Sequence, residues 1–161
     1  MCSVHTLTRP TQVGVGWDSG VVPSLLPSAT VGLDVDADAD TVWDLLVTVD
    51  QWPMWGPSVR RARLDDGSAR IDARATGTVW TSVGPRIPFR IDAWQDTGPV
   101  RHWSWHVAGL PATGHTVRVR GAGCRVEMTA PSLLPMYAPV LWIALRRVRN
   151  LAQEHPAPPS G

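Results

Sequence analysis

The sequence predicts an α+β fold, in which a curved antiparallel β-sheet wraps around one long C-terminal helix. Three observations support this prediction. Short alternating segments joined by turn residues fill the middle of the chain, helical patterns lie outside them, and the last pattern is long and amphipathic. Runs of strands with separate helices are typical of an antiparallel sheet that has one face covered and one face in water.

The closing helix carries one broad apolar face. An arc of roughly 140° contains Tyr137, Val140, Leu141, Ala144, Leu145, Val148, Leu151 and Ala152. Arg146, Arg149, Asn150 and Gln153 lie opposite. Proline is tolerated only in a first turn, so Pro135 and Pro139 predict that regular helix begins near Ala138. The apolar face needs a partner surface, which the strands must supply.

A first strand and two short helices are predicted before the main run of strands. Residues 30–36 alternate, and Asp38 or Asp40 can then cap a helix that continues to about Val49. Pro53 and the pair Gly56-Pro57 interrupt the helical pattern after it. The segment between them is predicted to form a second helical piece.

About six to seven strands are expected in total. After the first, alternation and turn residues place them near 59–64, 76–83, 87–95, 101–108, 115–120 and 124–130, and a further alternating stretch lies around 71–74. The expected inward-facing residues include Phe89, Ile91, Ala93, Trp103, Trp105, Val107, His115, Val117, Val119, Cys124, Val126 and Met128. Arg90, Asp92 and Trp94 are expected on the outer face. Trp80 and Trp94 together would form an apolar outer patch, through which the chain could form a homodimer.

Composition excludes several classes of function. The formal net charge is +1, all 15 cationic side chains are Arg and there is no Lys. A nucleic-acid partner is therefore not expected, and Schiff-base chemistry is excluded. His102 and His106 would lie about 13 Å apart on a strand, too far to share an ion. We expect no metal site and no cofactor.

One domain over residues 29–155 is expected, preceded by an irregular extension (1–28) and followed by a disordered tail (156–161). No apolar run is long enough to span a membrane, and the start of the chain lacks the pattern of a signal peptide. Cys2 and Cys124 are the only cysteines, and a disulfide between them is not expected. A cytoplasmic location is the resulting prediction.

The segment ADADTVWDLLVTVDQWPMWGPSVRRARL (37–64) resembles the opening of the polyketide cyclase/dehydrase and lipid-transport proteins, part of the START and birch-pollen-allergen-like (SRPBCC) superfamily. The matching features are Val42-Trp43, Asp50, Trp52-Pro53, Trp55, Pro57, Trp103, Trp105 and Gly114-His115. The resemblance spans about 29–153. It implies a helix-grip fold with a deep apolar cavity between the sheet and the C-terminal helix, in which relatives bind lipids, polyketides or hormones.

The candidate site residues follow from this cavity. The expected ligand-binding residues are Trp52, Trp55, Phe89, Ile91, Trp103, Trp105, Val117, Met128, Leu141 and Leu145. His115 is either a structural residue with satisfied hydrogen bonds or a polar anchor and general base, kept neutral by burial. Tyr137 is either a core residue or a catalytic acid.

Three functions stay open. The first is binding of a hydrophobic lipid, aromatic or polyketide-like molecule. The second is a cyclase or dehydratase that acts on such a ligand in the same cavity without metal or imine chemistry. The third is a protein-interaction module. The scarcity of inward-facing ionisable residues favours binding.

Overall fold

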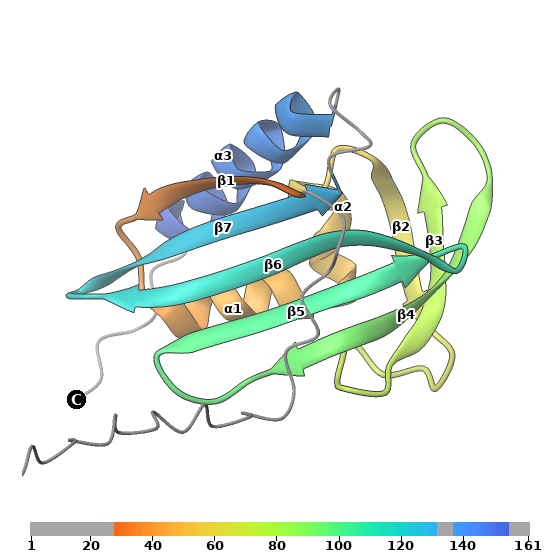
Figure 1. The fold of residues 1–161 in the computed structure, drawn as a ribbon, viewed down its shortest axis with the longest axis horizontal. Coiled ribbons are helices and arrows are strands. Elements are labelled where there is room, and N and C mark those ends of the chain that lie inside the picture. Colours follow the sequence, from red (N-terminus) through yellow and green to blue (C-terminus); the bar gives the residue numbers. More distant parts are fainter. Residues whose placement is uncertain (1–27, 132–136, 155–161) are drawn as a thin grey trace, which may run out of the picture.

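The computed structural model describes residues 28–131 and 137–154. Its seven strands form one antiparallel sheet in the order β1-β7-β6-β5-β4-β3-β2. The strands are β1 (Ser28–Val35), β2 (Val59–Leu64), β3 (Thr76–Thr81), β4 (Arg86–Gln95), β5 (Val100–Val107), β6 (Leu110–Arg120) and β7 (Gly123–Pro131). The sheet curls strongly, so that β2 and β3 run across the direction of the longer strands (Figure 1).

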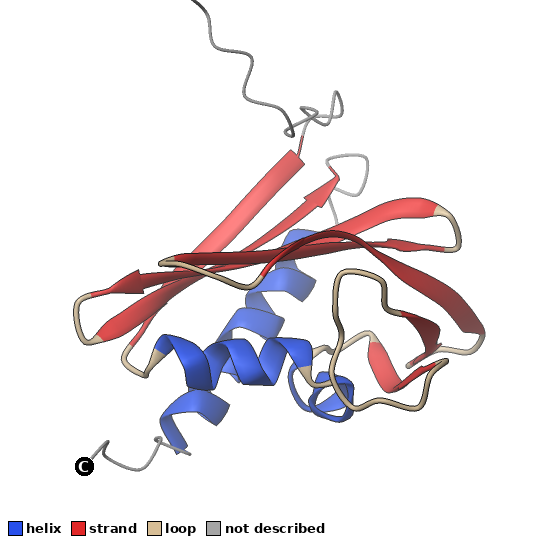
Figure 2. Ribbon diagram, turned by 90° about the horizontal axis from the view of Figure 1, so that it is seen from below, coloured by secondary structure: helices blue, strands red, loops and turns tan. Residues whose placement is uncertain are grey.

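The helices are α1 (Ala39–Val47), the single 3-10 turn η1 (Val49–Gln51), α2 (Trp52–Trp55) and α3 (Ala138–Glu154). All of them lie on one face of the sheet (Figure 2). This arrangement confirms the predicted helix-grip fold. The expected tail lies outside the described residues, as does the N-terminal extension apart from Ser28, which begins β1.

The start of α1 is capped as the acidic run predicted. The Asp38 carboxylate accepts a hydrogen bond from the backbone N–H of Asp40 at 2.7 Å, which satisfies one of the free donors of the first turn. The helix ends at Val47, two residues earlier than expected, because the chain continues as η1 and α2. Pro53 occupies the first turn of α2, where its missing N–H costs no hydrogen bond.

The apolar face of α3 is the main cover of the sheet. Its buried residues are Leu141, Ala144, Leu145, Val148 and Ala152. Trp142 and Ile143 lie beside this face and are each 44% exposed. The periodicity therefore predicted both the helix and the side that packs.

Two strand predictions were wrong. Residues 71–74 form no strand; the Ile71 N–H bonds to the carbonyl of Val47, and the Asp72 carboxylate accepts from the N–H of Arg74 in a turn. Ile71 is buried, so the apolar signal in this segment comes from one side chain that packs into the core from a loop. The other error concerns β6, which begins at Leu110 instead of His115, after a tight turn in which Ala108 and Gly109 both adopt positive φ.

A β-bulge at Asp92 overturns part of the predicted facing. Ile91 pairs with Trp105 and Ala93 with Ser104, so Asp92 is an extra residue on β4. The bulge turns Trp94 towards the helices, where its ring lies 5.6 Å from that of Trp43. Ala93 is exposed instead. Val119, expected to face inward, is also exposed.

Candidate functional site

Aromatic side chains fill the space between the sheet and the helices. Trp52 lies at the centre, stacked on Trp103 with ring centroids 5.5 Å apart and planes inclined by 6°. Phe89 and Trp105 contact the same indole at 5.4 Å and 5.2 Å. The Trp52 indole N–H donates to the carbonyl of Leu46 at 2.9 Å, which fixes the ring in this position. Trp52 is thus a core residue, buried away from any opening.

A small void lies between these rings and α3. It measures about 30 Å³ and is lined by residues that include Trp52, Trp55, His115, Met128, Tyr137 and Leu141. A void of this size holds about one water molecule. The deep cavity that the resemblance implied is therefore occupied by the protein's own side chains.

A larger apolar cavity opens at one end of the sheet. It measures about 330 Å³ and is lined by Ser58, Val59, Val79, Thr81, Ile87, Trp105, Val107, Leu110, Pro111, Ala112, Thr113, Ala130, Pro131 and Tyr137. Because Leu110 is 69% exposed, the cavity reaches the surface there. This is the end at which β5 and β7 finish, on the right in Figure 1. We call this space the outer cavity.

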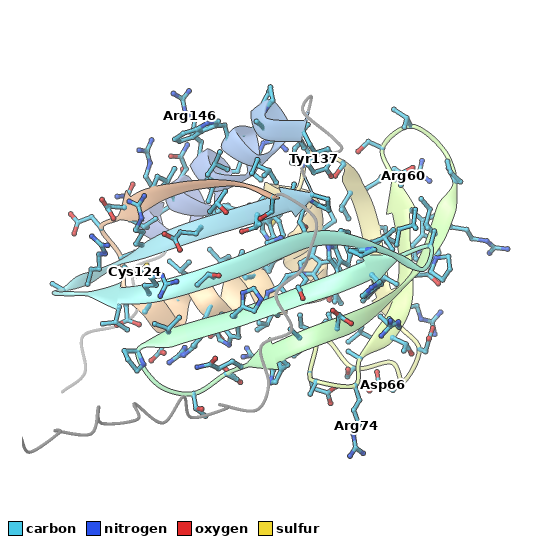
Figure 3. All side chains as sticks on the ribbon, viewed as in Figure 1. Arg60, Asp66, Arg74, Cys124, Tyr137 and Arg146 are labelled. Carbon is cyan, nitrogen blue, oxygen red and sulfur yellow. The ribbon has the colours of Figure 1, made fainter. Side chains whose placement is uncertain are left out.

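Two polar pairs separate the outer cavity from the small void, since their residues line both spaces. The Tyr137 and Ser58 hydroxyls are 3.2 Å apart. Figure 3 shows Tyr137 at the start of α3, where the helix meets the end of the sheet. On the other side, the Trp105 indole N–H donates to the Thr113 hydroxyl at 3.0 Å. None of the residues that line the outer cavity carries a formal charge at neutral pH.

His115 lies behind this partition and is 2% exposed. Its ring stacks on Trp103 at 4.0 Å, and the edge of Trp55 approaches it at 5.7 Å. Nε2 is 3.4 Å from the Thr113 hydroxyl, while Nδ1 has no hydrogen-bond partner among the described residues. Burial lowers the pKa of His115 to about 3, and the neighbouring His102 adds to the decrease. The imidazole is therefore neutral at physiological pH.

The predicted ligand-binding residues divide into three groups. Trp105 and the candidate Tyr137 line the outer cavity. The small void is bordered by Trp105, Tyr137, Trp52, Trp55, Met128, Leu141 and His115. Phe89, Ile91, Trp103, Val117 and Leu145 are buried in the hydrophobic core. Their assignment as ligand contacts stays a prediction.

Sequence reasoning missed most of the outer cavity lining. Val79, Ile87 and Val107 are inward-facing residues near strand ends, so their alternation was a usable signal. Leu110 to Thr113 lie outside the predicted strands, because Pro111 and the small residues around it weaken the strand pattern at the start of β6.

Other hollows and groups suit a ligand less well. A hollow of about 400 Å³ lies over the helices, lined by Thr41, Asp44, Leu45, Thr48, Gln51, Met54 and Leu151. It has a mixed polar lining and lies away from the sheet, so the outer cavity is the better apolar site. Within residues 28–131 and 137–154, no group of three acidic, His or Cys side chains is placed to hold a metal ion. No helix in these ranges is long and apolar enough to cross a membrane.

The architecture defines an α+β helix-grip protein with a hydrophobic interior. Residues 27–146 match the family described as polyketide cyclase / dehydrase and lipid transport, and the chain belongs to that family. The resemblance stated from the residues of the first helix is thereby confirmed. Hydrophobic ligand binding is the general function that this family suggests.

Several solved structures share the fold. A hypothetical protein, jhp0584, from Helicobacter pylori aligns over 92% of this chain and 99% of its own, with 10% identity and a TM-score of 0.65. A STAR-related lipid transfer protein from Xanthomonas axonopodis covers 83% of this chain and 90% of its own, with 14% identity and a TM-score of 0.60. XoxI from Bacillus cereus covers 80% and 98%, with 15% identity and a TM-score of 0.59. No curated protein matches the chain by sequence.

Proposed function

We propose that this protein binds one small, uncharged, hydrophobic molecule in the outer cavity. The observation that carries the proposal is an apolar space of about 330 Å³ beside an interior that is otherwise filled. That volume lies at the lower end of the range for small-molecule pockets. It suits a compact ring system or a short chain better than a two-chain lipid.

The lining favours a neutral ligand. Moving a carboxylate or sulfonate out of water costs several kcal/mol unless a cation pairs with it, and no cationic side chain lines the cavity. The available polar groups are hydroxyls: Thr81, Thr113, and the pair formed by Ser58 and Tyr137. A ligand with one or two hydroxyl or carbonyl groups would match them.

Catalysis is the less favoured alternative. A cyclase or dehydratase needs a group that takes up a proton near neutral pH, and a histidine whose pKa is about 3 is a weak base there. Cys124 is buried, and burial raises the pKa of its thiol to about 11, with Asp38 and Asp34 adding to the increase. Neither side chain is an effective base or nucleophile at pH 7.

A matched pair of dyes tests the proposal. N-phenylnaphthylamine is neutral, and anilinonaphthalene sulfonate has nearly the same skeleton with an added anion. Fluorescence titration of the full chain is expected to show saturable one-to-one binding of the neutral dye, at least about tenfold tighter than the sulfonate, given the uncompensated charge.

Variants then locate the dye. Ala112→Trp places an indole in the outer cavity and is expected to abolish binding. Ala93→Trp adds the same side chain at an exposed position on β4 and is expected to leave affinity unchanged. Equal effects of both substitutions, or no binding of either dye, would contradict the assignment.

A further inference from the structure

The outer face of the sheet carries a second hollow, on the opposite side of the hairpin that lines the outer cavity. It measures about 330 Å³ and is lined by Arg63, Leu64, Asp65, Thr78, Trp80 and Arg86. Alternation along β3 separates the two spaces: Val79 lines the outer cavity, while Thr78 and Trp80 line this hollow. The two sites are therefore independent.

Strand register gathers the arginines around Trp80. Arg61 on β2 pairs with Trp80 on β3, and Trp80 pairs with Arg86 on β4. Arg63 is opposite Thr78, one pair further along. Side chains at alternate positions share a face, so Arg61, Arg63 and Arg86 lie on the same side of the sheet as Trp80 and Thr78. Of the three arginines, Arg63 and Arg86 line the hollow.

These arginines differ from three others on the sheet's outer face, which have acidic partners. Arg90 lies 3.6 Å from Asp92, Arg118 lies 3.1 Å from Glu127, and Arg125 contacts both Asp34 and Glu127. By contrast, Arg61, Arg63 and Arg86 have no ion-pair partner among residues 28–131 and 137–154. Acidic partners therefore accompany Arg90, Arg118 and Arg125 but not the arginines around Trp80.

The excess charge is local. The whole chain has a formal net charge of only +1, so the cluster does not reflect a generally basic protein. Asp65 is the one carboxylate in the lining, and it accepts a hydrogen bond from the Thr76 hydroxyl at 2.7 Å. The lining therefore holds two guanidinium groups and a single carboxylate that already has a partner.

Trp80 orders part of this cluster. The guanidinium carbon of Arg61 lies 5.3 Å from the centroid of the Trp80 ring, within the range of a cation–π contact. The contact engages Arg61 at the Trp80 ring, while Arg63 and Arg86 are the guanidinium groups that line the hollow. The arrangement suits an anion with several acceptor oxygens.

We propose that this hollow binds a phosphate group, with Arg63 and Arg86 as the charged donors and Thr78 as a hydroxyl donor. A phosphate monoester carries close to two negative charges and accepts hydrogen bonds from several directions, and arginine forks match its oxygens. The same chemistry is present in a soluble phosphate monoester and in a lipid headgroup.

The test titrates glycerol phosphate into the full chain at constant ionic strength and follows the indole N–H signal of Trp80 by NMR, assigned with Trp80→Phe. The double variant Arg63→Gln/Arg86→Gln is expected to weaken binding more than about tenfold, since hydrogen bonds to charged groups contribute that much. The control is Arg90→Gln/Arg118→Gln, which removes the same charge from the same face outside the hollow; less than a twofold change is expected.

A second arm distinguishes the source of the phosphate. Sedimentation with phosphatidic acid vesicles, compared with phosphatidylcholine vesicles, reports recognition of a headgroup. Binding in either arm that depends on Arg63 and Arg86 but not on the control pair supports the site. Absence of binding in both arms, or equal loss in the two double variants, overturns it, and neither result depends on the outer cavity.

Discussion

His115 shows how hydrogen bonding defines the state of a buried polar residue. Trp105 can only donate to the Thr113 hydroxyl, so that hydroxyl must direct its own proton elsewhere. Its other described partner is Nε2 of His115. The direction of that hydrogen bond follows the tautomer of the ring, and Nδ1 has no partner among the described residues. A protonated ring carries an N–H on both nitrogens, so it would leave a buried donor at Nδ1 unpaired.

The low pKa of His115 makes stability depend on pH. The unfolded chain's imidazole has an ordinary pKa of about 6.5, whereas the folded value is about 3. Below pH 6.5 the unfolded state binds a proton that the folded state does not, so the free energy of unfolding falls as pH drops towards 3. This one group lowers it by at most about 1.4 kcal/mol per pH unit.

Guanidinium unfolding at pH 7 and pH 5 checks this prediction. His115→Phe keeps an aromatic ring against Trp103 and is expected to lose less stability between the two pH values than the unmodified protein. Burial also lowers the pKa of His102, but this contribution is present in both proteins and largely cancels in the comparison. The same pH dependence in both would show that His115 is protonated in the fold.

At the scale of single elements, β3 depends on a glycine. Gly77 pairs with Phe89 on β4, and the aromatic ring lies over it. A Cβ atom at this position would come within 2.8 Å of the ring and closer still to the backbone carbonyl oxygen of Arg63. The close approach of β2, β3 and the Phe89 ring therefore requires the absence of a side chain.

Gly77→Ala is expected to destabilise the protein by about 1–3 kcal/mol, as overpacked cores do. Gly114→Ala is the matched control, because its Cβ would meet the His102 ring at 3.2 Å, a side chain that can shift. Thermal unfolding should show the larger decrease in Tm for Gly77→Ala. Equal decreases would mean that β2 moves to accommodate the methyl group.

Most elements could be predicted because their periodicity is strong. The α3 face, the Asp38 cap and the strands β4 and β7 follow directly from apolar spacing and turn residues. The bulge at Asp92 could not be predicted. The alternation of β4 does not show where a single extra residue is inserted, and that residue decides which face each later side chain occupies. For that reason the sequence predicts Trp94 on the outer face. Its inward position in the structure removes one half of the expected apolar patch. A homodimer stays a prediction.

For the whole molecule, α3 buries one apolar face against the other elements of the core. Leu145 is fully buried there, whereas Ile143, two residues before it, is 44% exposed. Leu145→Ala is expected to cost about 2–5 kcal/mol by opening a cavity in the core. Ile143→Ala removes a similar volume from the rim and should cost much less in denaturant unfolding. Similar costs would mean that α3 does not grip the sheet through its predicted face.

The candidate site was less predictable than the fold. Alternation identifies which residues face inward, but it does not give the rotamers or the volume that remains between them. Trp52, Trp103 and Phe89 pack against one another in the core, and their role as ligand contacts stays a prediction. The larger apolar cavity lies towards Tyr137 and Leu110, where several strands end and side chains become smaller.

The position of the outer cavity bears on how quickly a ligand would exchange under the proposed function. A ligand enclosed beneath α3 would leave only when that helix separates from the sheet, so its residence time would depend on partial opening of the fold. A ligand near Leu110 would leave without moving the stacked rings of Trp52 and Trp103. Fast exchange that does not depend on thermal stability is therefore the expected consequence of a binding site at the surface.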